Sequence, residues 1–353
     1  MQTLRDGGIL SVMAFEAINS LGFDAEKVFL KCGVDIGRLQ NKNFRTPHAA
    51  QQLFWQILEE ETGDADIGLH LGQRLPIFKR HILAYLFLSS PTFSDGLAQT
   101  VRFLRLLSDA VSATVVICHD EKGDEAYLAY NVSNPLRHTL ESGAQSIIAF
   151  LNSTTDGAFK PTQIHFPHSS TVSAEKYAAV FGCPVRLEQN SDPQQTRIYF
   201  KSELLAMPSN YAEPELFKVH EAIASSHLAK LEMQDAVADV KTAIAELLDS
   251  GVVNLKTVAQ KLGMKPRMLR NVLYQADTNF NTVVAECRCL LAKQLLGRSN
   301  KPMDIIVYQT GFSEPSTFYR AFKRWTGTTP IKYRKKKQDI LREAFEYASS
   351  VVA

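Results

Sequence analysis

Two segments in the C-terminal third combine glycine, proline and basic residues at a spacing that suits DNA recognition. In each, an apolar helical stretch ends at a glycine, Gly263 or Gly311, and a second helical stretch begins at a proline, Pro266 or Pro315. Glycine accepts the positive φ that a tight turn between two helices requires, and proline is favoured at the first position of a helix. The pattern predicts two helix-turn-helix units, each of which inserts its second helix into a major groove.

The second helix of each unit is expected to present polar residues on its outward face. These residues are Arg267, Arg270 and Asn271 in the first unit, and Pro315, Ser316, Tyr319 and Arg320 in the second. Between the units, a helix of roughly 18 residues from Asn279 to Gly297 would span ~27 Å. Since one turn of B-DNA is ~34 Å long, this helix can place the two units in successive major grooves on one face of the DNA.

Charge is distributed unevenly along the 353 residues. Residues 1–230 carry a net charge of −5, whereas residues 231–340 carry +8. A basic module binds a polyanion such as double-stranded DNA through its phosphates. The chain is therefore expected to join a DNA-binding module to a domain with another task.

Other classes of protein are not supported. The sequence has no apolar run of ~18 residues that would span a membrane, and no secretory signal is expected at its start. The cysteines, at positions 32, 118, 183, 287 and 289, are too sparse for a disulfide framework or a zinc site, so we expect free thiols in a reducing cytoplasm. Because the known catalytic and phosphate-binding motifs are absent, we expect no enzyme activity, no cofactor and no metal.

The first 205 residues are predicted to form an α+β domain. Thr46 followed by Pro47 is typical of a helix start, and the helix is expected to bury Leu53 among its apolar residues. A turn is expected at 121–124. The remaining pattern predicts a helix at 135–158 and strands at 114–118, 127–130, 164–166, 185–187 and 197–200.

The chain is predicted to divide into four parts. These are a sensing or dimerising domain at 1–205, a linker helix at 206–233, an all-α double helix-turn-helix domain at 234–340 and a tail at 341–353. In the linker, Leu216, Val219, Ile223 and Leu231 recur at helical spacing. That stripe fits packing against a domain and pairing with a second subunit equally well.

The second unit resembles the signature of AraC/XylS-type transcription regulators. The residues that carry the resemblance are Gly311-Phe312, Phe318, Arg320, Phe322-Lys323, Gly327, Pro330 and Tyr333-Arg334. It covers about the last 100 residues. The N-terminal part is similar, more weakly, to the sensing domain of the ornithine-utilisation-regulator branch, which is arabinose-binding-like, through segments 161–168, 181–185 and 204–208.

The resemblance implies a role for each matching position. Arg267, Arg270, Asn271, Pro315, Ser316, Tyr319 and Arg320 would read bases, since arginine pairs with guanine and asparagine with adenine. The expected phosphate contacts are Lys265, Lys323, Arg324, Lys332, Arg334, Lys335, Lys336 and Lys337, for which a solvated basic surface is the alternative. The expected structural positions are Gly263, Gly311, Phe312 and Pro330.

Three residues depart from the family pattern. Lys265 stands where relatives carry a serine or threonine that caps the helix, and Asn271 stands where an arginine is usual. Val307 replaces a small alanine at the crossing of two helices. These departures leave the target sequence open.

The expected function is a cytoplasmic, sequence-specific transcription regulator that contacts RNA polymerase, an activator or, as the alternative left open, a repressor. An unidentified small effector or dimerisation through the N-terminal domain would control it. The alternative is a regulator without a ligand, whose N-terminal domain only binds protein. Six aromatic residues (Phe150, Phe159, Phe166, Tyr177, Phe181 and Phe200) fit a pocket or an ordinary core, and Arg137, Arg186 and Arg197 fit an anionic effector or a charged surface.

Overall fold

The computed structural model divides the chain into two compact units, Met1–Leu228 and Ala229–Ala353. It describes residues 4–41, 44–75, 81–120, 123–170, 173–188, 195–248 and 253–339. The expected tail and two residues of the expected turn, Glu121 and Lys122, lie outside the described residues.

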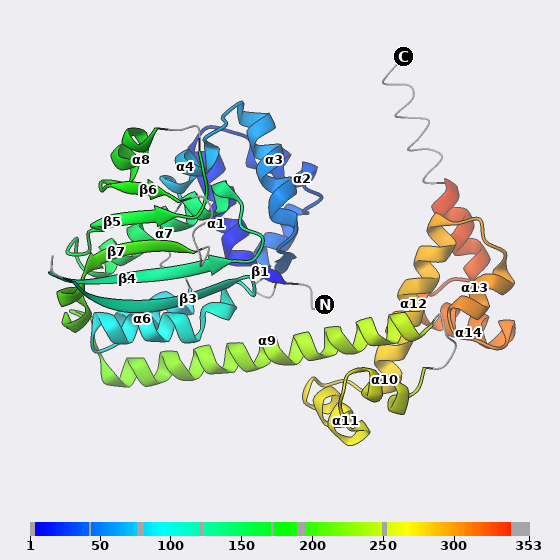
Figure 1. The fold of residues 1–353 in the computed structure, drawn as a ribbon. Coiled ribbons are helices and arrows are strands. Elements are labelled where there is room, and N and C mark those ends of the chain that lie inside the picture. The colour runs from blue at the N-terminus through cyan, green and yellow to red at the C-terminus, as the bar shows by residue number, and fades with distance from the viewer. Residues whose placement is uncertain are drawn as a thin grey trace, which may run out of the picture. The chain divides into compact units, whose positions relative to one another are not determined.

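The first unit begins with a helical layer and a two-stranded sheet (Figure 1). Its elements are β1 (Arg5–Gly7), α1 (Gly8–Ser20), α2 (Ala25–Lys31), the 3₁₀ helix η1 (Ile36–Gln40), β2 (Arg45–Pro47), α3 (Ala50–Thr62), α4 (Ile67–Gly72), α5 (Ile82–Ser89), α6 (Phe93–Arg102) and the 3₁₀ helix η2 (Leu104–Leu106). One apolar cluster joins α1, α2, α3 and α4, with Ile18, Phe29 and Leu58 almost fully buried in it.

The second layer is a five-stranded sheet with the order β3-β4-β7-β5-β6. Its elements are β3 (Val111–Asp120), β4 (Gly123–Val132), α7 (Arg137–Thr154), β5 (Gln163–Phe166), α8 (Ala174–Phe181), β6 (Val185–Leu187), β7 (Thr196–Lys201) and the 3₁₀ helix η3 (Ser202–Ala206). Among the described strands, only β5 and β6 pair in parallel, and α8 connects them as a crossover. The α+β class and the five predicted strands are confirmed.

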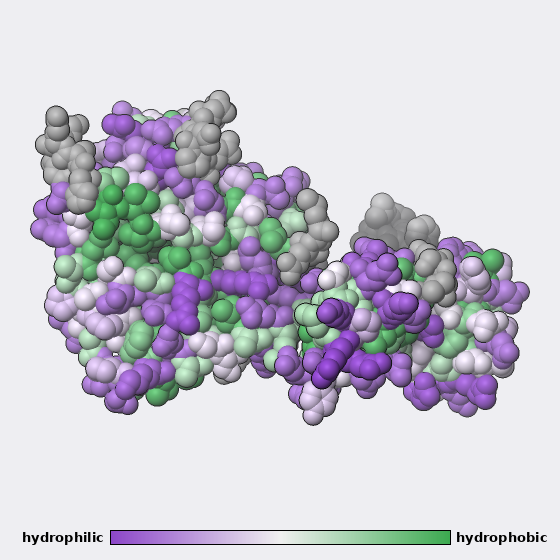
Figure 2. Space-filling model, turned by 60° about the horizontal axis from the view of Figure 1, so that its bottom comes forward, coloured by the Kyte–Doolittle hydropathy of each residue, from purple (hydrophilic) through white to green (hydrophobic). Residues whose placement is uncertain are grey.

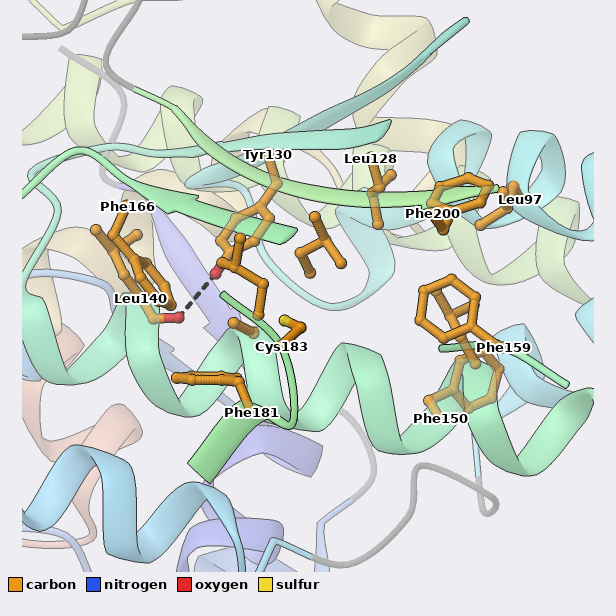
Figure 3. Packing of buried hydrophobic residues seen from close by; sticks show 14 of the residues in the cluster. Leu97, Leu128, Tyr130, Leu140, Phe150, Phe159, Phe166, Phe181, Cys183 and Phe200 are labelled. Carbon is orange, nitrogen blue, oxygen red and sulfur yellow. Dashed lines mark hydrogen bonds between the residues drawn. The ribbon is translucent and has the colours of Figure 1, made fainter. Parts of the chain in front are cut away.

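The core of this layer lies between the sheet and α7. Phe150 and Phe159 gather with Phe200 and Leu97 at one end of the cluster (Figure 3). At the other end the hydroxyl of Tyr130 donates a hydrogen bond of 2.7 Å to the carbonyl of Leu140 (Figure 3). The bond satisfies the hydroxyl of a tyrosine that is only 3% exposed.

The predicted helix start at Thr46-Pro47 is wrong. The two residues form β2, which pairs with β1 so that Thr46 lies opposite Asp6, and α3 begins only at Ala50. A residue before proline is disfavoured in the helical region and favoured in the extended one. Leu53, predicted to be buried, is 46% exposed, and Trp55 is buried instead.

Helix α7 is shorter than predicted. It ends at Thr154, and Asp156 and Gly157 then take positive φ values of 50° and 87°. Two consecutive residues in the left-handed region end a right-handed helix.

Helix α9 (Pro214–Leu248) supplies residues to the cores of both units and extends beyond the expected linker. In the first unit, Phe217, Ala224 and Leu228 pack with residues of α5 and with Phe103. Leu216, Val219 and Ile223 are 52%, 52% and 40% exposed, whereas Leu231, in the second unit, is buried. The predicted stripe is therefore split between solvent and core. Hydrophobic residues also gather on part of the surface of the first unit (Figure 2).

The second unit is all-helical in its described residues. It contains α10 (Leu255–Lys261), α11 (Pro266–Gln275), α12 (Phe280–Arg298), α13 (Met303–Gln309) and α14 (Pro315–Thr326), and a further helix covers 330–339. Val283 and Val284 of α12 belong to the core around α10 and α11, whereas Ala292 and Leu296 belong to the core around α13 and α14. One helix is therefore part of both small cores.

Candidate nucleic-acid interface

The first helix-turn-helix is built by α10 and α11. Val258 and Ala259 of α10 and Leu269 and Leu273 of α11 are completely buried against each other's helix and its neighbours. Gly263, in the turn, has φ +67°, and a Cβ at this position would meet no atom within 4 Å. The glycine is therefore required for its backbone conformation and not for close packing.

The second helix-turn-helix is built by α13 and α14. Ile306 and Val307 of α13 pack with Phe318 and Phe322 of α14, and Val307 is only 4% exposed. Valine in place of the expected alanine thus lies within the core. Gly311 has φ +76°, but here a Cβ would lie 3.1 Å from Nη2 of Arg288 and 3.2 Å from Cδ2 of Leu248. A side chain at this turn would therefore have to adopt a strained conformation and would also require Arg288 or Leu248 to shift.

The outward face of α11 carries the predicted residues of the first unit. Arg267, Arg270 and Asn271 are all exposed, and their side chains form no hydrogen bond or ion pair with any described residue. The sequence did not single out Met268 and Tyr274, which are 56% and 81% exposed on the same helix. A tyrosine exposed to this degree on a helix surface offers an apolar ring to a base or sugar.

The outward face of α14 carries most of the predicted residues of the second unit. Pro315, Ser316 and Arg320 are exposed. Tyr319 is only half-exposed, because its ring packs edge-on against Phe318 at a centroid distance of 6.0 Å. Tyr319 thus belongs in part to the core.

A hollow of about 650 Å³ separates α14 from the start of α12. Arg320 and Arg324 of α14 line it together with Asn281 and Arg288 of α12. Three guanidinium groups on one concave surface produce a positive potential that attracts phosphate. The sequence did not point to Asn281 and Arg288, because both lie on α12. That helix is outside the two helix-turn-helix motifs.

The two recognition helices begin in the same way. Each has proline at its first position, and neither Lys265 nor Glu314, the residue that precedes the proline, caps the helix with its side chain. The neighbouring helices α10 and α12 are capped by Asn254 and Asn279. The first turn of each recognition helix therefore keeps backbone N–H groups that no cap engages.

The predicted phosphate contacts fall into two groups. Lys265, Lys323, Arg324, Lys332, Lys335, Lys336 and Lys337 are exposed. Arg334 is half-buried, and its Nη2 donates a hydrogen bond of 2.7 Å to the carbonyl of Lys301. This contact ties the helix at 330–339 to the start of α13. Pro330, which begins that helix, is buried.

In the first unit, the arginines that could bind an anionic effector have other surroundings. Arg137 Nη1 lies 3.1 Å from the carboxylate of Asp66, and Arg137 also faces the fully buried Glu141 at 3.8 Å. Arg186 is exposed, and Arg197 lies 5.9 Å from the centre of the Tyr127 ring. Arg137 is thus already paired with two carboxylates.

The six aromatic residues belong to the core between the sheet and α7. Of the six, Phe150 also lines the cavity described below. Among the residues that the structure describes, no group of three or more His, Cys, Asp or Glu side chains is placed to hold a metal ion. No helix in the described ranges has the length and apolar character needed to cross a membrane.

Two family models match the chain. The arabinose-binding domain of AraC transcription regulators matches residues 22–209, and a helix-turn-helix domain matches residues 258–336. The matched ranges lie in the first and second units respectively. Both recognition helices fall within the second range.

Similar proteins are bacterial transcription regulators, not enzymes. The ornithine utilization regulator of Pseudomonas aeruginosa is 28% identical over 277 residues, which cover 77% of this chain and 79% of that protein. The regulator GadX of Escherichia coli is 23% identical over 49% of this chain and 61% of that protein. The solved structure of CdpR from P. aeruginosa aligns with 88% of this chain and 96% of its own, at 17% identity and a TM-score of 0.39.

Proposed function

Because the chain belongs to the AraC family of transcription regulators, we propose that it reads two successive major grooves of promoter DNA with α11 and α14. The observation that carries this proposal is the pair of recognition helices, each begun by a proline and each with exposed arginine on its outward face. Helix α12, with 19 residues, is ~28 Å long. That length is close to the ~34 Å of one turn of DNA.

Arg267, Arg270, Asn271, Ser316 and Arg320 are proposed to read bases. The exposed lysines of the helix at 330–339 are proposed to hold phosphates. Arginine and asparagine read guanine and adenine through paired hydrogen bonds, whereas lysine binds phosphate as a point charge. The protein would act in the cytoplasm and activate transcription through contact with RNA polymerase.

The first unit is proposed to control this binding through a small effector or through dimerisation. An effector shifts the affinity for DNA only if it binds two states of the protein with different affinity. For dimerisation, the exposed stripe of Leu216, Val219 and Ile223 on α9 offers an apolar surface. Tyr85 of α5 extends this surface, since the centre of its ring lies 5.7 Å from that of His220, which is on α9.

The relative from P. aeruginosa is named for ornithine utilisation, and an amino acid is therefore one candidate effector. It would need a cation for its carboxylate and anions for its ammonium groups. Arg137 already pairs with Asp66. A regulator without any ligand is the second candidate, and the dimerisation stripe is the observation that favours it.

Selection of genomic fragments by the purified full-length protein, at one fixed physiological salt concentration, tests the proposal. The expected result is a motif with two half-elements about one helical turn apart. The double variant Arg270→Ala/Arg320→Ala is the control and should lose the motif while it keeps weak binding. Retention of all sequences alike, sensitive only to salt, would contradict the proposal.

A further inference from the structure

The first unit contains a cavity of about 330 Å³ that neither the motifs nor the aromatic cluster account for. It lies where the helical layer meets the five-stranded sheet. Its walls come from helices α1 to α7, the 3₁₀ helix η2 and strands β1 to β4. Protein interiors rarely leave spaces larger than a water molecule, whereas ligand sites occupy about 300–1,000 Å³. The volume is therefore that of a site for a small molecule.

The walls are mainly apolar. Phe54 and Trp55 of α3 face the cavity, as do Ile147 and Phe150 of α7 and Val111 of β3. Besides these larger residues of α7, the small residues Gly143 and Ser146 also line the cavity and leave space beside them. Apolar walls hold water poorly and gain free energy when an apolar body replaces it.

The one carboxylate among the described lining residues is already neutralised. Asp6 is 3% exposed, and its Oδ2 lies 2.9 Å from Nδ1 of His48. Nε2 of His48 lies 2.8 Å from the carbonyl of Ser133. Because an imidazole donates from both nitrogens only when it is protonated, His48 is a cation that balances Asp6.

The other ionisable groups of the lining are neutral. The Tyr130 hydroxyl donates to the carbonyl of Leu140, and burial raises the pKa of Tyr130 and that of the Cys32 thiol. No lysine or arginine is among the described residues that line the cavity. The hydroxyls of Ser11 and Ser146 lack a hydrogen-bond partner among the described residues and remain as neutral donors and acceptors.

We propose that this cavity binds an uncharged, largely apolar small molecule whose polar groups are neutral ones, such as a hydroxyl, a ketone or an ester. A charged group would lose its hydration on entering the cavity and would find no counter-ion among the described lining residues. The free-energy cost of this desolvation exceeds what burial against the apolar walls contributes. A sugar or an amino acid would leave most of its hydrogen-bonding groups unpaired. The role of the uncharged molecule as an effector rests on the proposed function, whereas its binding in the cavity does not.

Binding is tested on the full-length protein with N-phenyl-1-naphthylamine, an uncharged dye that fluoresces in apolar surroundings. Competitors of equal chain length are decanol, decanoate and protonated decylamine. The expected result is one saturable dye site per chain, with decanol at least about tenfold more effective than either charged competitor. Absence of saturable binding, or equal competition by a charged chain, would overturn the proposal.

A variant that fills the cavity locates the site. A Cβ added at Gly143 meets only Oη of Tyr130, at 3.7 Å, so Gly143→Leu places its side chain in the cavity without a backbone clash. We expect at least about tenfold weaker dye binding with no loss of thermal stability, whereas Gly143→Ala, the matched control, should bind within about threefold of the native chain. If Gly143→Leu does not fold, Ser146→Leu replaces it. A folded variant with native dye affinity would overturn the assignment.

DNA affinity measured with and without decanol separates this inference from the proposed function. If the ligand binds in the cavity and DNA affinity stays constant, effector control fails and the ligand site stands. If the protein selects a two-part DNA motif but binds no uncharged ligand, the ligand site fails and the proposed DNA reading stands.

Discussion

The guanidinium carbon of Arg288, in α12, lies 4.9 Å from the centre of the Phe312 ring, directly after the turn of the second helix-turn-helix. Its Nη2 also donates a hydrogen bond of 3.0 Å to the carbonyl of Gly311. Burial lowers the pKa of Arg288. A single side chain thus connects the helix between the two units to the turn that directs α14.

Arg288→Ala should destabilise the second helix-turn-helix more than the first. The variant loses a charge-assisted hydrogen bond and a cation–π contact, worth together about 1–3 kcal/mol. Hydrogen exchange of the full-length protein should show faster exchange in α13 and α14 than in α10 and α11. Gln294→Ala, an exposed position on the same helix, is the control, and equal acceleration in both variants would refute the role of Arg288.

The two turn glycines should respond differently to alanine. Gly263→Ala meets no neighbour and should cost only the conformational strain of positive φ, about 1–2 kcal/mol. Gly311→Ala carries the same strain and also displaces Arg288 or Leu248, so its cost should be clearly larger. Denaturant unfolding of both variants gives the comparison, and equal losses would show that the second turn has room for a side chain.

Arg270→Ala and Arg320→Ala should each weaken binding to the selected motif by about 1–3 kcal/mol, with little change on random DNA. The physical reason is that a bidentate arginine contact to guanine depends on the base. Titrations against both DNAs at one salt concentration measure the difference. Equal losses on motif and random DNA would reassign both arginines to phosphate contacts.

Lys335→Ala should weaken binding to all sequences alike. A lysine that neutralises one phosphate releases counter-ions, so its loss should reduce the slope of log affinity against log salt by about one unit. The measurement is a salt titration with the motif and with random DNA. An unchanged slope would mean that the Lys335 ammonium is only solvated.

The ion pair between Asp6 and His48 predicts a pH-dependent stability of the first unit. Burial alone would raise the pKa of Asp6, but hydrogen bonds from His48, Ser108 and Gln51 together lower it below 3.8. The hydrogen bond to Asp6 raises the pKa of His48 above 6.5. The contribution of Asp6 is lost as the pH falls through its lowered pKa, and that of His48 is lost as the pH rises through its raised pKa.

Asp6→Asn should therefore lower the free energy of unfolding most between these two pKa values, near pH 5–6, by about 3 kcal/mol. The loss should be smaller at higher pH. Unfolding of the full-length protein at several pH values measures the difference from the native chain. Glu203→Gln, at an exposed carboxylate, should show no such profile. A cost for Asp6→Asn that does not vary with pH would contradict a protonated His48.

Val219→Glu tests the apolar stripe on α9. The side chain is 52% exposed, so the free energy of unfolding of the monomer should fall by less than about 0.5 kcal/mol. If the stripe forms a dimer, the charge should raise the dimer dissociation constant by at least about tenfold. Sedimentation of both proteins measures this shift, and an unchanged dissociation constant would place the dimer contact elsewhere.

The helix-turn-helix units were predictable because their signals are local. Gly263 and Pro266 lie three positions apart, and both take the conformations that their residue types favour. The strands β5, β6 and β7 were also marked by their own apolar runs. Each element could be recognised without knowledge of its partner.

The errors concern residues whose state depends on distant partners. Thr46 forms a strand because β1 pairs with it 40 residues away, and Arg288 matters because Gly311 accepts its hydrogen bond 23 residues later. The cavity was missed for a related reason. It arises where side chains from twelve elements fail to meet, and an unfilled space has no residue pattern of its own.

The uncapped starts of α11 and α14 have a consequence for what binding does to the protein itself. In the free protein, water must satisfy the backbone N–H of Arg267 in α11 and those of Ser316 and Thr317 in α14, which have no hydrogen-bond partner among the described residues. If α11 and α14 enter the major groove as proposed, a phosphate or a base edge would take the place of that water. Under that proposal DNA would complete the hydrogen bonding of both recognition helices, which should then fray less at their first turns in the complex than in the free protein.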